Sequence, residues 1–207
     1  MNALNYTLVS DGSSDRMLLP ILSWVLQQAH PTWTFNREWA DLHTVRSKST
    51  SLTDRIRLSV EWFPCKILFI HRDAELAQPE KRHAEIDAAL RKVTLNTSPI
   101  IIHVIPIRMT EAWLLFDEAA IRQAAGRPGN KPKLVMPALK QLETLPDPKA
   151  TLFDLLTQAS NLTGRRAKNF RPHERAYRMA ELIDDFSPLR SLSAFRALEA
   201  DVQALSL

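Results

Sequence analysis

The sequence predicts an α/β fold: a mainly parallel four-stranded sheet flanked by helices, followed by a helical C-terminal extension. Three observations lead to this prediction. Apolar segments alternate with amphipathic helical segments over the first half of the chain. Residues 66–70 and 99–107 are apolar without alternation, which is typical of strands buried on both faces. The connections are long enough for helical crossovers, which favour parallel strands joined with right-handed connectivity.

The first strand is predicted at Tyr6–Ser10, and it stops at the turn that begins with Asp11. A serine after that turn can cap the next helix, in which Pro20 predicts a kink or a late helix start. A second strand is predicted near Asp41–Val45. These three elements form the first strand–helix–strand unit.

The next units repeat this order. Apolar residues at helical spacing predict a helix over residues 52–63 that ends before Pro64. The strand Lys66–Ile70 follows at once, and Pro79 is well placed as the first residue of a third helix. The apolar run Pro99–Ile107 predicts the fourth strand.

Beyond the fourth strand the chain is expected to be helical. Thr110 can cap a helix over Glu111–Ala125, and Gly126 would close it. Residues 126–149 are rich in proline and predict loops with one short helix near Leu139. Three further helices are predicted at 152–156, 175–185 and 193–205. We therefore expect an α/β domain at residues 1–125, with 126–207 as a loop-rich segment and helical extension packed on it.

Composition limits the class of protein. The chain has 207 residues, of which 45% are hydrophobic, so it can bury a core of its own. A net charge of +4 is compatible with a polyanionic partner but does not require one. A single cysteine, Cys65, excludes a disulfide framework and a multi-cysteine zinc site. No apolar run approaches the about 18 residues that span a bilayer, so we expect a cytoplasmic protein without a membrane partner.

Four carboxylates follow predicted strands. Asp11 comes after the first strand, Asp73 and Glu75 after the third, and Glu111 after the fourth. The carboxyl ends of parallel strands share one edge, and side chains two apart in extended backbone point the same way. Clustered carboxylates repel one another unless a cation lies among them. The pattern predicts a Mg²⁺ or Mn²⁺ site.

Each acid also has a purely structural interpretation. Asp11 before a glycine can stabilise a turn and the start of a helix, and Glu111 in a first helical turn complements the helix dipole. Asp73 and Glu75 can mark a solvated turn at the end of a strand. These alternatives remain open from the residues alone.

A basic segment is the second candidate site. Residues 161–178 contain six lysines and arginines and one acid, Glu174. We expect Arg165, Arg166, Lys168 and Arg171 to contact a nucleic-acid backbone, which would make binding sensitive to salt. The alternative is a solvated helix surface.

Several motifs resemble one family. Residues 8–15 (LVSDGSSD) resemble the first strand and turn of the Toprim fold, and residues 70–75 (IHRDAE) resemble its Asp-x-Asp strand end. Residues 105–115 (IPIRMTEAWLL) and the Asp147-Pro148-Lys149 sequence are similar to a small Toprim group. That group is related to the overcoming-lysogenization-defect nucleases and often accompanies a separate ATPase in bacterial anti-phage loci.

The resemblance implies a function and a set of ligands. Asp11, Asp73 and Glu75 correspond to the acidic metal-binding triad, and Glu111 is the additional acid of the group. Asp11 is one methylene shorter than the usual Glu and Glu75 is longer than the usual Asp; these two departures fit either a compensated metal site or a subunit without catalysis. The implied function is Mg²⁺- or Mn²⁺-dependent cleavage of DNA or RNA in anti-phage defence with a partner ATPase.

Two other functions remain possible. One is a Toprim-shaped subunit without catalysis that binds a partner ATPase or nucleic acid. The other is a phosphatase or phosphotransferase with Asp73 as nucleophile, although the residues after Asp73 lack the Asp-x-Asp-x-Thr/Val pattern of such enzymes. The chain has no Walker phosphate loop, so an ATP-driven step would require a partner. Oligomerisation is also possible.

Overall fold

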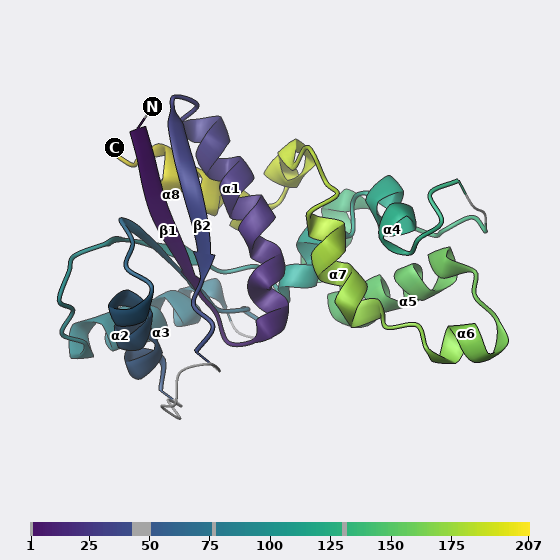
Figure 1. Ribbon diagram of the computed structural model, residues 1–207, viewed down its shortest axis with the longest axis horizontal. Helices are drawn as coiled ribbons and strands as arrows, with labels where there is room; N and C mark the ends of the chain where they lie inside the picture. Colours follow the sequence, from purple (N-terminus) through teal and green to yellow (C-terminus); the bar gives the residue numbers. More distant parts are fainter. Residues whose placement is uncertain (1, 43–50, 76–77, 130–131) are drawn as a thin grey trace. The chain divides into compact units, whose positions relative to one another are not determined.

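The computed structural model describes residues 2–42, 51–75, 78–129 and 132–207. The chain divides into two compact units, which are coloured along the sequence in Figure 1. The first, here called the sheet unit, comprises Met1–Ile105 and Ala197–Leu207. The second, here called the helical unit, comprises Pro106–Arg196. Each unit is described by itself below.

The sheet unit confirms the predicted fold class. Its elements, in chain order, are β1 (Asn2–Val9), the 3-10 helix η1 (Ser13–Met17), α1 (Leu18–Ala29), β2 (Trp33–Trp39), α2 (Leu52–Trp62), β3 (Ile67–His71), α3 (Pro79–Lys92) and β4 (Ile100–Val104). Among the described residues the sheet has four strands in the order β2-β1-β3-β4, and all neighbouring pairs are parallel. The last helix, α8 (Ser193–Gln203), begins in the helical unit and ends in the sheet unit.

Helices cover both faces of the sheet (Figure 1). On one face, Val9 and Ile70 belong to an apolar cluster that also contains Ile56 of α2 and Ile86 of α3. On the other face, the Tyr6 hydroxyl donates a hydrogen bond to the carbonyl of Leu19 in α1 at 3.0 Å. Successive residues of a strand point to opposite faces. The parity of each residue in β1 and β3 therefore decides whether it faces α1 or the pair α2 and α3.

Local sequence explains where the helices begin. Pro20 lies in the first turn of α1, after the separate 3-10 helix η1, so the predicted late start is confirmed. Ser51 caps α2 by accepting a hydrogen bond from the backbone N–H of Asp54 at 3.1 Å. Pro79 is the first residue of α3, as predicted.

The predicted position of the second strand is wrong. The strand is Trp33–Trp39, whereas Asp41 and Leu42 are outside any strand and residues 43–45 lie outside the described residues. β2 is an edge strand that pairs with β1, and Arg37 and Glu38 on it are exposed. Strand propensity and hydrophobic alternation identify strands that are half-buried, and they do not identify an exposed edge strand with many polar residues. The polar residues of β2 therefore hid it in the sequence.

The helical unit has its own core. Its elements are η2 (Thr110–Leu114), α4 (Glu118–Ala124), η3 (Leu139–Thr144), α5 (Pro148–Ser160), α6 (Gly164–Lys168), α7 (Pro172–Ala180) and η4 (Ser187–Ser191). Trp113 is fully buried and meets Phe195 edge to face, with 5.5 Å between ring centroids. Leu114 and Leu115 are also fully buried. The apolar residues after Glu111 are therefore core residues of this unit.

The helix predicted over Glu111–Ala125 is interrupted. η2 ends at Leu114, and the side chain of Asp117 then accepts a hydrogen bond from the N–H of Ala120 at 2.9 Å. This cap starts a new helix, α4, because Asp competes for backbone donors better at a helix start than inside a helix. Gly126 closes α4 as expected, with a positive φ of 83° that favours glycine.

Candidate site at the carboxyl edge of the sheet

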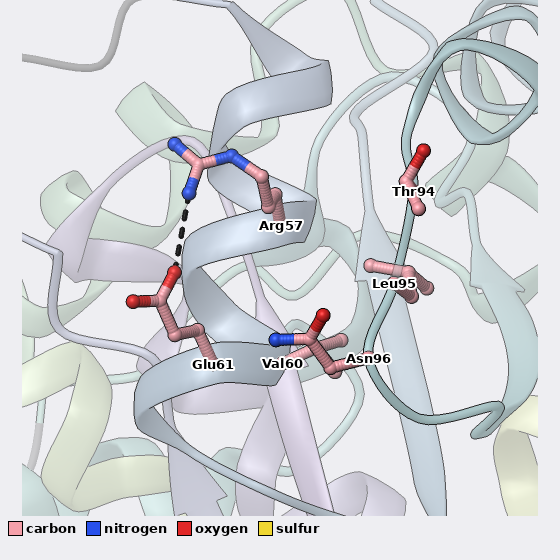
Figure 2. Close-up of a pocket in the computed structure, with 6 residues that line it drawn as sticks. All are labelled: Arg57, Val60, Glu61, Thr94, Leu95 and Asn96. Atoms are coloured by element: carbon pink, nitrogen blue, oxygen red, sulfur yellow. Dashed lines mark hydrogen bonds and ion pairs between the residues drawn. The ribbon is translucent and has the colours of Figure 1, made fainter.

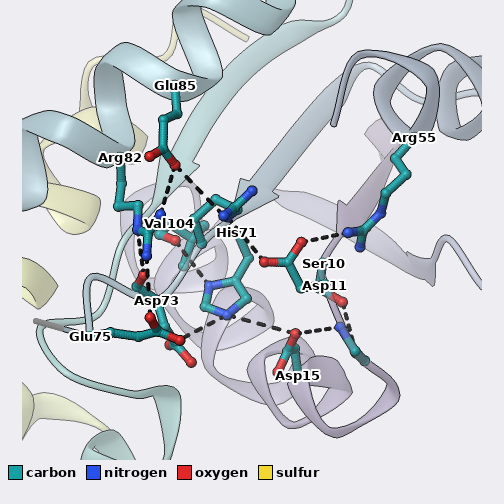
Figure 3. Close-up of polar contacts among 12 residues, drawn as sticks. Ser10, Asp11, Asp15, Arg55, His71, Asp73, Glu75, Arg82, Glu85 and Val104 are labelled. Atoms are coloured by element: carbon teal, nitrogen blue, oxygen red, sulfur yellow. Dashed lines mark hydrogen bonds and ion pairs between the residues drawn. The ribbon is translucent and has the colours of Figure 1, made fainter. Parts of the chain in front are cut away.

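Asp11 is held by two arginines. In the register of β1 and β3, Val9 lies opposite Ile70, and two residues further along Asp11 comes beside Arg72. The Arg72 Nε lies 3.0 Å from the Asp11 carboxylate, and Arg55 of α2 donates to its other oxygen (Figure 3). The Asp11 charge is therefore compensated on the face covered by α2 and α3.

A different pair of carboxylates meets on the other face. The His71 Nε2 lies 3.8 Å from an oxygen of Asp15 and 3.5 Å from an oxygen of Asp73 (Figure 3). Asp15 belongs to η1, just before α1, and its Oδ2 also accepts a hydrogen bond from the N–H of Gly12 at 2.9 Å. The His71 side chain is only 2% exposed, so β3 brings one buried imidazole between two acids.

The hydrogen bonding of His71 defines what its second nitrogen can do. Its Nδ1 lies 3.0 Å from the carbonyl oxygen of Val104 in β4. A carbonyl oxygen accepts and cannot donate, so Nδ1 carries the hydrogen. In a neutral ring, Nε2 then turns its lone pair toward the carboxylates of Asp15 and Asp73. A second ring proton or a bound cation removes this repulsion.

Glu75 does not extend the strand. Its φ is +54°, so the backbone is not extended there, and the expectation that Asp73 and Glu75 point the same way by strand geometry is wrong. Arg82 of α3 contacts both residues instead, through the Asp73 carbonyl at 2.9 Å and the Glu75 carboxylate at 3.4 Å. A hydrogen bond to Glu85 is the main reason why the pKa of Arg82 is raised.

Glu111 belongs to the helical unit. It is 4% exposed, and Lys149 Nζ lies 3.6 Å from its carboxylate. Two separate motifs of the Toprim resemblance, around Glu111 and at 147–149, therefore meet within this unit. Asp11, Asp73 and Glu75 belong to the sheet unit, so the expectation that Glu111 joins them at one site stays a prediction.

The donor set fits a divalent cation better at His71 than at Asp11. Over the described ranges, no three His, Cys, Asp or Glu side chains are placed so that they could hold an ion as they stand. Two ligands of one ion lie about 3 Å apart, and the distances of 3.5 and 3.8 Å around His71 Nε2 are somewhat wider. A small rotation of the two carboxylates would be needed. His71 Nδ1 donates to the backbone carbonyl of Val104, and metal-bound histidines commonly donate their other ring N–H to a backbone carbonyl in this way.

Sequence reasoning missed Asp15 and the two helix arginines Arg55 and Arg82. Asp15 was part of the quoted motif at residues 8–15, but it was not assigned a role. Its spacing of four residues from Asp11 was the available signal. The arginines carried no signal of their own, because Arg55 and Arg82 come from helices whose positions depend on the folded structure.

The basic segment lies in the helical unit. Arg165, Arg166 and Lys168 are in α6, Arg171 immediately precedes α7, and all four are exposed. Arg175 lies over the ring of Phe170, 5.9 Å from its centroid. Phe170 thus has a cation–π partner in its own unit, while the four predicted contact residues present their charge to solvent.

A hollow elsewhere in the sheet unit is separate from these acids. It measures about 220 Å³ and is lined by residues of α2 and of the loop before β4, namely Arg57, Val60, Glu61, Thr94, Leu95 and Asn96 (Figure 2). The loop precedes β4, so this hollow lies toward the amino end of that strand. Arg57 donates to Glu61 at 3.1 Å, which leaves no group here with an evident reactive role.

Comparison with known proteins adds no assignment. No protein-family model matches the chain, and no curated protein or solved structure matches it. In the part of the chain that the structure describes, no helix has the length and apolar character needed to span a bilayer.

Proposed function

We propose that the protein is a divalent-cation-dependent nuclease of Toprim-like type that cleaves phosphodiester bonds in DNA or RNA. The observation that carries this proposal is the placement of His71 Nε2 between the carboxylates of Asp15 and Asp73. These donors lie where α/β folds commonly bind ligands, at the carboxyl ends of parallel strands. The resemblance of residues 8–15 and 70–75 to Toprim motifs supports the same function.

Asp15, His71 and Asp73 would hold Mg²⁺ or Mn²⁺. When bound, such an ion polarises a phosphate oxygen and lowers the pKa of a water molecule. Arg82 orients Asp73 by donating a hydrogen bond to the backbone carbonyl of that residue. Arg55 and Arg72 present positive charge at the same edge of the sheet. Either arginine can contact a phosphate of the substrate if Asp11 releases it. In this proposal Asp11 positions arginines and is not a ligand of the ion.

A second candidate function is a subunit without catalysis that binds nucleic acid or a partner ATPase. The observation that favours it is the pairing of Asp11 with both Arg55 and Arg72. Asp11 is the residue that the Toprim resemblance assigns to the metal, and two guanidinium groups compete with any ion for its carboxylate. In either case the proposed partner ATPase and the role in anti-phage defence rest on the resemblance.

The experiment compares cleavage of plasmid DNA and tRNA by the wild type and four variants, with Mg²⁺ or Mn²⁺ and with EDTA. We expect Asp73→Asn and Asp15→Asn to lose activity by about 100-fold or more, because each removes a negative donor. Asp11→Asn should lose less than about 10-fold, because it acts through the arginines. Asp154→Asn is the matched control, since Asp154 is exposed on α5.

Three outcomes would decide against parts of this proposal. Equal loss in Asp11→Asn and Asp73→Asn, with Asp15→Asn active, would restore Asp11 as the ligand. Full activity of Asp73→Asn would remove the nuclease site from this edge. Absence of cleavage by the wild type, with nucleic acid still retained and also with a partner ATPase added, would support the subunit without catalysis.

The basic segment is tested with the same substrates. Reversing Arg165 and Arg166 to Glu should weaken retention of nucleic acid and reduce its dependence on salt, because phosphate contacts release counterions. The same double variant should bind Mn²⁺ as the wild type does. Unchanged retention would show that these exposed arginines form a solvated helix surface.

A further inference from the structure

Two histidines face each other on the other side of the sheet unit from His71. His83 comes from α3 and His103 from β4, and their Nδ1 atoms are 2.8 Å apart. The rings are tilted by 33° with 5.1 Å between centroids, so the contact is made by the two nitrogens and not by stacked ring faces. Neighbouring residues of a strand point to opposite faces, and Ile70 lies opposite His103 in the register. This separates the pair from the edge site.

Both histidines border an open hollow of about 430 Å³. Its wall also includes Asp201 of α8, near the carboxyl end of the chain. On the far side of the His103 ring, Asp87 of α3 lies 3.7 Å from Nε2. One imidazole is thus flanked by an imidazole on one nitrogen and by a carboxylate on the other.

We propose that His83 and His103 form a binding site for a late first-row transition metal ion such as Zn²⁺, with both Nδ1 atoms as ligands. At Zn–N distances of about 2.0–2.1 Å, two ligand nitrogens lie about 2.9–3.4 Å apart. The observed 2.8 Å is close to the lower end of this range, so the rings need to separate only slightly. The ion takes the place of the proton that the two nitrogens otherwise share.

The surroundings supply what a histidine ligand needs. With Nδ1 bound to the ion, the His103 Nε2 carries the hydrogen and faces Asp87, the carboxylate partner that orients many metal-bound histidines. Burial lowers the pKa of His103, and His83 lowers it further, while Asp87 and Asp201 oppose this shift. With 2.8 Å between the two Nδ1 atoms, at least one of them accepts a hydrogen bond and carries no hydrogen, and the unprotonated nitrogen is the form that binds metal.

The open hollow sets the kind of site. Both histidines border the hollow, where water can complete the coordination, since no third His, Cys, Asp or Glu of the described residues is placed to join them as ligand. Imidazole nitrogen selects Zn²⁺, Cu²⁺ or Ni²⁺ over Mg²⁺, which prefers oxygen. This site therefore differs in metal preference from the carboxylate site proposed for nuclease activity, and each proposal can fail without the other.

The test is calorimetric titration of the full chain with Zn²⁺ after treatment with EDTA and its removal. We expect one Zn²⁺ per chain that depends on the two histidines, in addition to any Zn²⁺ held at the carboxylate site, and this ion should bind much more weakly in both His83→Gln and His103→Gln. Asp87→Asn should weaken Zn²⁺ binding by about 10- to 100-fold, because this is the typical effect of removing a carboxylate that hydrogen-bonds a metal-bound histidine. His173→Gln is the control, because the His173 side chain is 63% exposed in the helical unit. Circular dichroism shows whether each variant is folded.

A second control separates the two metal sites. Asp73→Asn should keep the Zn²⁺ that depends on His83 and His103, and can lose only an ion held at the carboxylate site. Unchanged affinity in both His83→Gln and His103→Gln would overturn the proposal, as would a loss of zinc binding in Asp73→Asn with both histidine variants unaffected. If one histidine variant does not fold, the other and Asp87→Asn still decide the question. The absorption spectrum of bound Co²⁺ provides an independent measure and should show the same losses.

Discussion

At the carboxyl edge of the sheet, the acidic side chains on one face have different partners from those on the other face. On the face of α2 and α3, Asp11 has two guanidinium partners, Arg55 and Arg72. On the face of α1, two carboxylates, Asp15 and Asp73, approach one imidazole nitrogen. At Asp11 two guanidinium groups thus face one carboxylate, and at His71 two carboxylates face one imidazole nitrogen.

This difference follows from strand parity. Leu68, Ile70 and Arg72 alternate with Ile67, Phe69 and His71, so Arg72 and His71 leave β3 on opposite sides. Asp11 follows Val9 on the Arg72 side. A carboxylate that follows a strand is therefore not enough to predict a metal site. Its parity, and the residue beside it on the next strand, decide whether it meets a cationic side chain or another acid.

The largest effect on stability is expected from His71. His71→Ala should lower the free energy of unfolding by about 2–3 kcal/mol, because it removes a fully buried side chain and one hydrogen bond to the Val104 carbonyl. That carbonyl keeps its bond from the Arg72 N–H, which limits the loss. Urea unfolding followed by tryptophan fluorescence measures it, since Trp24, Trp33, Trp39 and Trp62 lie in the sheet unit and only Trp113 in the other.

The exposed His173 again provides the control, and His173→Ala should unfold like the wild type. A loss below about 0.5 kcal/mol in His71→Ala would mean that the α1 face does not depend on this imidazole. The comparison between the two faces would then lose its main support.

A smaller effect is expected from the Asp11–Arg72 pair on the opposite face. A double-mutant cycle with Asp11→Ala and Arg72→Ala should give a coupling energy of about 0.2–1 kcal/mol, because both side chains are partly exposed to water and salt. Arg55 remains as a partner of Asp11 in the Arg72 variant, which reduces the coupling further. The coupling should decrease as ionic strength rises. A coupling of about 3 kcal/mol or more would instead indicate a desolvated pair.

The fold could be predicted because its buried strands are visible in the sequence. Residues 67–71 are buried throughout and residues 100–104, although on an edge strand, are partly or fully buried, so both segments are apolar at nearly every position. β2 could not be placed, because an exposed edge strand that contains Arg37 and Glu38 has no such signal. The break at Asp117 was also missed, since a capping aspartate and a solvated helical aspartate look alike in sequence.

The candidate site was predicted only in its location. The ends of β1 and β3 were recognised, and acids do gather there. Which acids meet depends on the register between strands and on side chains from α2 and α3, and neither follows from residue spacing. The turn at Glu75, with its positive φ, also ended the extended geometry on which the pairing of Asp73 with Glu75 relied.

The smallest effect at neutral pH is expected from His103. Its pKa is lowered below the ordinary value of 6.5, mainly by burial and then by His83, while Asp87 and Asp201 oppose the shift. Well above pH 6.5 the histidine is neutral in both states, so it contributes no dependence on pH there. As the pH falls below 6.5, the unfolded chain binds a proton that the folded chain does not yet bind. Folding stability attributable to His103 must therefore decrease from pH 6.5 downward.

Urea midpoints measured in EDTA, from about pH 7.5 to about pH 5, test this sign. The wild type should lose stability toward acid more steeply than His103→Gln, because the variant has no imidazole to protonate at that position. His173→Gln should follow the wild-type slope, since its side chain is exposed and belongs to the helical unit. Parallel slopes in the wild type and His103→Gln would mean that the His83–His103 contact opens before it protonates.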